Sequence, residues 1–146
     1  MPEISLFTLY IVALFAIKHC IADYFLQDIR VYKSLFGIES IDKTTLSDPG
    51  ASAHAGIHGL GTLLILLHLD VPLFSSFGIA VLDYILHLLT DFSKSTTVKH
   101  YSLVSASPHT YVGRHEYRNR IYAFWVITGV DQTIHGLCYL AYIVLI

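Results

Sequence analysis

Apolar and polar stretches alternate along the chain, and four of the apolar stretches are long. They cover about residues 4–29, 54–70, 72–92 and 119–146. Each is close to the ~20 apolar residues that a helix needs to cross a bilayer. The helices of a soluble bundle would carry a continuous polar face, which GTLLILLHL and YLAYIVLI lack. The pattern predicts one all-α domain, residues 1–146, folded as a polytopic four-transmembrane-helix bundle.

Composition and charge support a membrane location. Hydrophobic residues make up 54% of the chain and charged residues 14%, against about 25% charged in an ordinary soluble domain. All lysines and arginines except Lys18, which lies inside the first apolar stretch, lie in or beside the two long polar loops, whereas the LDVP hairpin and both termini carry none. The positive-inside rule therefore places the long loops in the cytoplasm and both termini outside. We expect an integral membrane protein with both termini outside, a lipid-bilayer environment and no nucleic-acid partner.

Each predicted helix carries a pair of His or Asp residues four positions apart. Residues at i and i+4 share a helix face, so both side chains can reach one metal ion. Counted at ~1.5 Å per residue from the outer helix ends, all the pairs fall in one layer toward the cytoplasmic side. The predicted ligands are His19, Asp23, His54, His58, His87, Asp91, Asp131 and His135.

Ionisable groups inside a bilayer need compensation. A charged side chain near the centre costs about 2.5–3.5 kcal/mol on insertion scales. A divalent cation held by imidazole and carboxylate groups is the simplest partner, and a neutral network of Asp–His hydrogen bonds is the alternative. Eight ligands exceed the needs of one tetrahedral zinc ion. They suit one or two ions, with zinc first and iron or manganese left open.

Four further residues border the predicted layer. Asp83 precedes His87 by one helical turn and is expected to orient a ligand rather than bind the metal. Lys94 is expected at the cytoplasmic rim, where its ammonium can reach water and hold an anionic group. Gln27 and Gln132 are expected to hydrogen-bond a ligand or a substrate. We group these four as candidate catalytic residues.

The third loop carries a cluster of arginines in VGRHEYRNR, just before the last helix. They are Arg114, Arg118 and Arg120. One interpretation is topogenic charge that binds anionic lipid headgroups. The other is a phosphate clamp for a lipid or phosphorylated substrate, because guanidinium groups match phosphate geometry.

Four motifs follow one another in the chain. They are H-x3-D-[FY]-x-L-Q at 19–27, H-x3-H at 54–58, H-x3-D-x2-K at 87–94 and D-Q-x2-H at 131–135. Together they resemble a family of small bacterial and phage integral membrane proteins, catalogued as a domain of unknown function. The resemblance implies a bacterial inner membrane as the location, with periplasmic termini. The resemblance covers nearly the whole chain and implies no established activity, and the third loop looks longer than in that family. A looser similarity links the pattern to small membrane-bound metal-dependent hydrolases.

The favoured function is a metal-dependent hydrolase that acts on an amphiphilic or phosphorylated substrate from the cytoplasmic side. Bound ions would lower the pKa of a coordinated water to about 7. A metal-ion or proton transporter is the first alternative, because intramembrane Asp and His also mark ion pathways. Transport would require a homo-oligomer, since four spans leave little room for alternating access. Two further alternatives are a structural scaffold whose helices are held together by a metal ion and a diiron-type redox site. Redox sites in helix bundles usually use Glu and E-x-x-H motifs.

Overall fold

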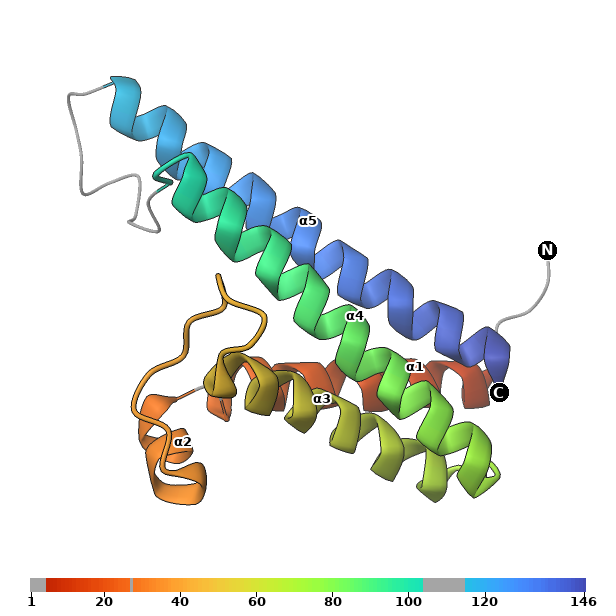
Figure 1. The fold of residues 1–146 in the computed structure, drawn as a ribbon. Helices are drawn as coiled ribbons and strands as arrows, with labels where there is room; N and C mark the ends of the chain where they lie inside the picture. The colour runs from red at the N-terminus through yellow and green to blue at the C-terminus, as the bar shows by residue number, and fades with distance from the viewer. Residues whose placement is uncertain (1–4, 27, 104–114) are drawn as a thin grey trace.

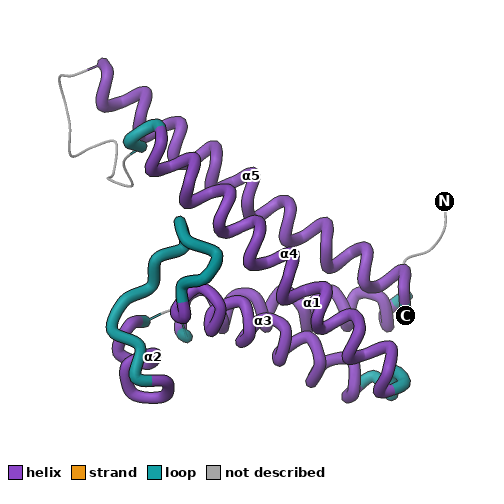
Figure 2. The backbone as a smooth tube through the Cα atoms, in the orientation of Figure 1, coloured by secondary structure: helices purple, strands orange, loops and turns teal. Residues whose placement is uncertain are grey.

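The computed structural model describes residues 5–26, 28–103 and 115–146, and these residues form helices joined by loops (Figures 1 and 2). The all-α prediction is confirmed for this part of the chain. The helices are α1 (Leu6–Cys20), the π-helical turn η1 (Ile21–Phe25), α2 (Ile29–Phe36), α3 (Pro49–His68), α4 (Leu73–His100) and α5 (His115–Leu145).

Three of the described helices are long and apolar enough to cross a membrane. They are α1 with η1 over Leu6–Tyr24, α3 and α4. The predicted fourth span corresponds to α5, which has 31 residues but is not among the three. Asp131, Gln132 and His135 lower the mean hydropathy of its apolar part.

Many large apolar side chains are exposed on the surface, whereas several polar side chains are buried in the interior. Phe74 is 91% exposed and Leu6 is 86% exposed, whereas His58 and His87 are buried. Water-soluble monomers rarely leave large apolar patches uncovered. This distribution agrees with helices that face lipid on the outside and pack polar side chains on the inside.

The helix ends differ from the predicted ranges. The first helix gives way to η1 and then to α2, which begins after Asp28, at the end of the range predicted for the first helix, and is followed by Gly37 with a φ of 68°. Asp48 caps α3, and Pro49 occupies its first turn, where proline costs no hydrogen bond. The predicted third helix, α4, continues to His100, since exposed polar residues end an apolar pattern without ending a helix.

The long helices pack as antiparallel neighbours (Figure 1). A tight turn at 69–72 joins α3 to α4, with Asp70 in the left-handed region at a φ of 56°, which confirms the predicted hairpin. Both α3 and α5 pack against α4, and α1 packs against α3 and α5. The apolar core joins all four helices and consists of Ile11, Phe15, Leu66, Ile79, Tyr139 and Tyr142.

Small residues bring α3 and α4 close together. A Cβ atom at Gly59 would lie 2.9 Å from the backbone oxygen of Ala80. Glycine at such a position lets two helix backbones approach. This approach brings the buried His54 and His58 of α3 toward the buried His87 of α4.

Candidate metal centre

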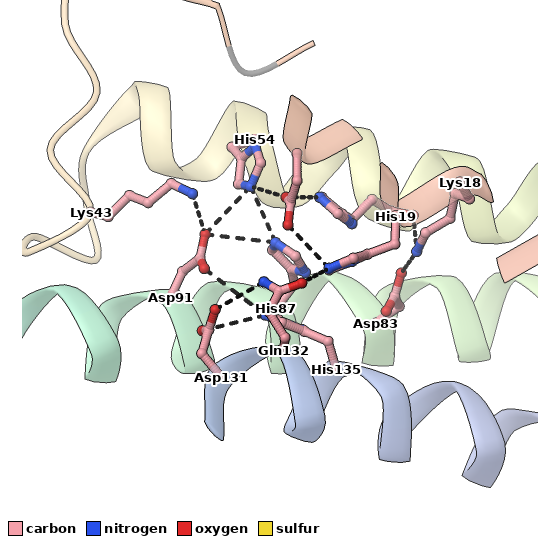
Figure 3. Close-up of polar contacts among 12 residues, drawn as sticks. Lys18, His19, Lys43, His54, Asp83, His87, Asp91, Asp131, Gln132 and His135 are labelled. Carbon is pink, nitrogen blue, oxygen red and sulfur yellow. Dashed lines mark hydrogen bonds and ion pairs between the residues drawn. The ribbon is translucent and has the colours of Figure 1, made fainter. Parts of the chain in front are cut away.

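Four predicted ligands meet between η1, α3 and α4 and are named here the first group. The group consists of Asp23, His54, His58 and His87. One ligand atom from each residue lies within 4.8 Å of the ligand atoms of the other three. The three histidines are at most 1% exposed. Figure 3 shows two of these rings, His54 from α3 and His87 from α4, lying close to one another.

Three of the six distances between ligand atoms of the first group fit a tetrahedral ion. His58 Nε2 lies 3.1 Å and His54 Nε2 lies 3.3 Å from Asp23 Oδ1. The Nε2 atoms of His87 and His54 are 3.2 Å apart. Tetrahedral zinc with bonds of about 2.0–2.1 Å separates its ligand atoms by about 3.3 Å. Three imidazole nitrogens and one carboxylate oxygen are also a donor set that zinc accepts.

A second group adjoins the first, because His87 belongs to both. It consists of His87, Asp91 and His135. His87 Nε2 lies 3.6 Å from Asp91 Oδ2, and His135 Nε2 lies 4.0 Å from Asp91 Oδ1. Asp131 Oδ1 lies 3.6 Å from His135 Nε2. The two groups could hold one or two ions.

Several buried polar atoms of these groups lack a hydrogen bond to any described residue. They include the His135 Nε2 and Asp131 Oδ1 atoms. An unsatisfied buried polar atom costs about 1–3 kcal/mol. A cation between the imidazole nitrogen and the carboxylate oxygen would satisfy both atoms, so these residues also fit a metal ion.

Lysines accompany three of the aspartates that lie in the long apolar segments of the sequence. Lys43 donates to Asp91 (Figure 3), and Lys94 Nζ lies 2.8 Å from Asp131 Oδ2. Lys18 Nζ lies 2.8 Å from Asp83 Oδ2. These ion pairs compensate three carboxylates for which the sequence predicted compensation by a metal ion. They also place positive charge beside the second group, which opposes cation binding there.

Tyrosines and polar neighbours orient the histidine rings. The Tyr32 hydroxyl lies 3.1 Å from His54 Nδ1, the nitrogen opposite the candidate ligand atom. Burial, with the carboxylates of Asp23 and Asp91, raises the pKa of Tyr32 to about 12, so this hydroxyl stays protonated at neutral pH. Metal-binding histidines commonly use their second nitrogen in this way, which holds the ring orientation.

His19 lies beside the first group without belonging to it. Its Nε2 atom is 2.8 Å from Gln132 Oε1 and 3.1 Å from Asp23 Oδ2, and its Nδ1 atom is 3.0 Å from the Tyr139 hydroxyl. Gln132 in turn donates to Asp131 Oδ2 at 3.2 Å. His19 and Gln132 therefore connect a carboxylate of the first group to a neighbour of the second.

Asp83 lies in neither group. Its carboxylate accepts hydrogen bonds from Lys18, from Thr62 at 2.7 Å and from Tyr142 at 3.2 Å. Each of these donors is buried. The carboxylate thus belongs to a separate buried network that joins α1, α3, α4 and α5.

The predicted site residues not yet placed are Gln27 and the three arginines. Gln27 and Arg114 lie outside the described residues, as does the side chain of Arg118, and Arg120 is half-buried near the start of α5. Of the lysine partners, Lys94 was among the predicted site residues, whereas Lys18 and Lys43 were not. Lys18 had a visible signal, a charged residue inside an apolar span. Lys43 had none, because it lies in a polar loop.

Comparison with known proteins gives no match to a family model, a curated protein or a solved structure. The resemblance of the four motifs to a family of small membrane proteins therefore stays a prediction. Interpretation of the site rests on its own geometry.

Proposed function

We propose that the protein is an integral membrane metalloprotein in which α5 forms the fourth span of the bundle. The observation that carries the proposal is the convergence of Asp23, His54, His58 and His87 within 4.8 Å. Three histidines turned toward one carboxylate, at tetrahedral spacing, favour zinc, with iron or manganese as alternatives. Asp91 and His135, with Asp131 beside them, would hold a second ion.

We further propose that the centre hydrolyses an amphiphilic or phosphorylated substrate. When bound, a divalent ion at such a site supplies an activated water and polarises a carbonyl or phosphoryl oxygen. The chain's own residues would position the substrate: His19 and Gln132 offer hydrogen bonds beside the centre, and Lys94 offers positive charge. Arg114, Arg118 and Arg120 are proposed to attract an anionic headgroup, with the long loops on the cytoplasmic side.

The three lysine–aspartate pairs favour a second candidate, a metal-free network. The pairs Lys18–Asp83, Lys43–Asp91 and Lys94–Asp131 are salt bridges between different elements. A chain of ion pairs and imidazole rings can hold helices in register or carry protons. In such a network the histidines would exchange protons and hydrogen bonds with one another, and the protein would bind no metal.

Metal content decides between the two. Wild type, His58→Ala and His68→Ala are purified in detergent and measured by inductively coupled plasma mass spectrometry. The control, His68, is an exposed histidine on the same helix, where it contacts Tyr10. We expect one or two equivalents in wild type and His68→Ala and a loss in His58→Ala. No metal in wild type after reconstitution with zinc, manganese and iron would overturn the metalloprotein and support the metal-free network.

Turnover tests the reaction. Metal-loaded wild type is incubated with acyl-ester and phosphate-ester amphiphiles in mixed micelles. We expect one ester class to be hydrolysed by wild type and by His68→Ala but not by His58→Ala. Metal binding without hydrolysis of either class would overturn the hydrolase and leave a metal-binding scaffold or transporter.

A further inference from the structure

An apolar groove of about 520 Å³ runs between α1 and α5. Its walls include Val12 and Phe15 from α1 and Leu137, Leu140 and Ile143 from α5. Leu137 is 60% exposed and Leu140 is 52% exposed. The groove therefore opens to the outer surface, which in a membrane faces lipid chains.

One end of this groove is polar. His19 and Gln132 line it, with His19 Nε2 2.8 Å from Gln132 Oε1. His19 also contacts Asp23 of the first group, and Gln132 contacts Asp131 beside the second. The groove thus leads from a lipid-facing surface to side chains that contact the candidate metal centre.

A second surface groove gives a useful contrast. It lies between α3 and α4, has a volume of about 200 Å³ and is lined by residues such as Leu60, Phe77 and Val81. Its lining has no charged or imidazole side chain among the described residues. Annular lipid needs only an apolar surface of this kind, whereas the α1–α5 groove pairs an apolar wall with a polar end.

Gly136 forms part of the wall of the α1–α5 groove. A Cβ atom at this position would meet no other atom within 4 Å. A larger side chain at Gly136 would project into open space rather than into a neighbouring helix. Gly129 has the same open surroundings two turns earlier on α5 but does not line the groove.

We infer that the α1–α5 groove holds the hydrocarbon chain of the amphiphilic substrate, with the polar group of that substrate at His19 and Gln132. The inference rests on the proposed hydrolase function and adds a route of entry from the bilayer. An occupant with one apolar chain and one polar end matches the polarity of the groove. A flanking helix from a second copy would instead set apolar side chains against the polar His19–Gln132 end.

Photo-labelling in a bilayer tests this inference. The full chain is reconstituted in phosphatidylcholine vesicles with a fatty acid that bears a diazirine on its chain, and labelled peptides are mapped by mass spectrometry. We expect labelling in the α1–α5 groove to exceed that in the α3–α4 groove by about tenfold, the ratio that ~1.4 kcal/mol of extra binding gives. Gly136→Leu should abolish the excess, whereas Gly129→Leu should leave it unchanged. Gln132→Leu should lower it, because the carboxylate end loses a polar partner.

Equal labelling of the two grooves in wild type would overturn the inference and identify ordinary annular lipid. An excess that persists in Gly136→Leu would overturn it as well. So would a cross-link between two protein copies through the α1–α5 groove. Metal content and circular dichroism are recorded on the same samples to show that each variant is folded.

The same samples separate the two proposals. Excess labelling in a protein that binds no metal would support the chain-binding groove and overturn the metal-dependent hydrolase. Bound metal with equal labelling of both grooves would support the metal centre and overturn the groove.

Discussion

Lys18 Nζ donates a hydrogen bond to Asp83 Oδ2 at 2.8 Å and so joins α1 to α4 through two side chains that are 7% and 3% exposed. The same ammonium donates to Thr62 Oγ1 and to the backbone oxygen of His58. A Cβ atom at Gly61 would lie 2.7 Å from Lys18 Cγ, so glycine leaves the space that the lysine stem fills. The pair therefore helps to fix the position of α1 against α3 and α4.

Removal of one charge from this pair should be more harmful than removal of both. Lys18→Met leaves Asp83 buried without its cation, for which we expect a loss of about 3–5 kcal/mol in the free energy of unfolding. Lys18→Met combined with Asp83→Leu removes both charges and should recover most of that loss. Denaturant unfolding in detergent measures both. A double variant no more stable than Lys18→Met would show that the charge pair is not the cause.

Lys94 should weaken metal binding at the second group. Its ammonium occupies Asp131 Oδ2 and repels a nearby cation. Lys94→Met should raise the affinity for the second zinc ion by tenfold or more, since a lost repulsion of ~1.4 kcal/mol has that effect. Competition with a coloured chelator measures the change.

Lys99→Met is the matched control for that measurement. Lys99 is an exposed lysine on the same helix and donates to Thr44. Its loss should leave the affinity for the second ion unchanged. An equal rise in affinity in both variants would show that the net charge of the protein is the cause. An unchanged affinity in Lys94→Met would show that Lys94 does not compete with the ion for Asp131.

Gly59 should tolerate no side chain. The Cβ of Gly59→Ala would lie 2.9 Å from a backbone oxygen of Ala80, and backbone cannot move aside as a flexible side chain can. We expect a destabilisation of about 1–3 kcal/mol, the usual cost of overpacking. Gly56→Ala on the same helix meets open space and should be neutral or stabilising. Thermal unfolding in detergent compares them, and equal melting temperatures would contradict close α3–α4 packing.

The start of α2 should depend on pH. Asp28 accepts a hydrogen bond from the Arg30 backbone N–H and pairs with the Arg30 guanidinium, which lowers the pKa of Asp28 to about 2 from an ordinary 3.8. Because the folded pKa is the lower one, this stabilisation is present above pH 3.8 and is lost as the pH falls through about 2. The protection factors of the first α2 amides against hydrogen exchange, which correct for the pH dependence of the intrinsic rate, should fall over that range.

Two substitutions separate the hydrogen bond from the charge at Asp28. Asp28→Asn keeps an acceptor for the helix N-terminus, so α2 should stay protected without the pH dependence. Asp28→Ala removes the cap, and exchange should be fast at every pH. Identical exchange in wild type and Asp28→Ala would show that the cap does not stabilise α2.

The i, i+4 pairs allowed much of the candidate site to be predicted. His54 with His58, and His87 with Asp91, share a face because helix geometry is local. Their partners on other helices were harder to predict. Lys18 precedes His19 by one residue and so points to a different side of α1, toward Asp83. Lys43 reaches Asp91 from a loop whose path no periodicity describes.

The long apolar stretches, the LDVP turn and the i, i+4 spacing predicted the long helices, their hairpin and the polar stripes, since each depends on neighbours within a few residues. Tertiary packing decided which stripes meet. The contact between Gly59 and Ala80 sets the approach of α3 and α4 and so helps bring His87 to His54 and His58. The same packing leaves His19 beside the first group, bonded to Gln132. Helix rotation and crossing depend on contacts between distant segments, and a one-dimensional pattern does not contain them.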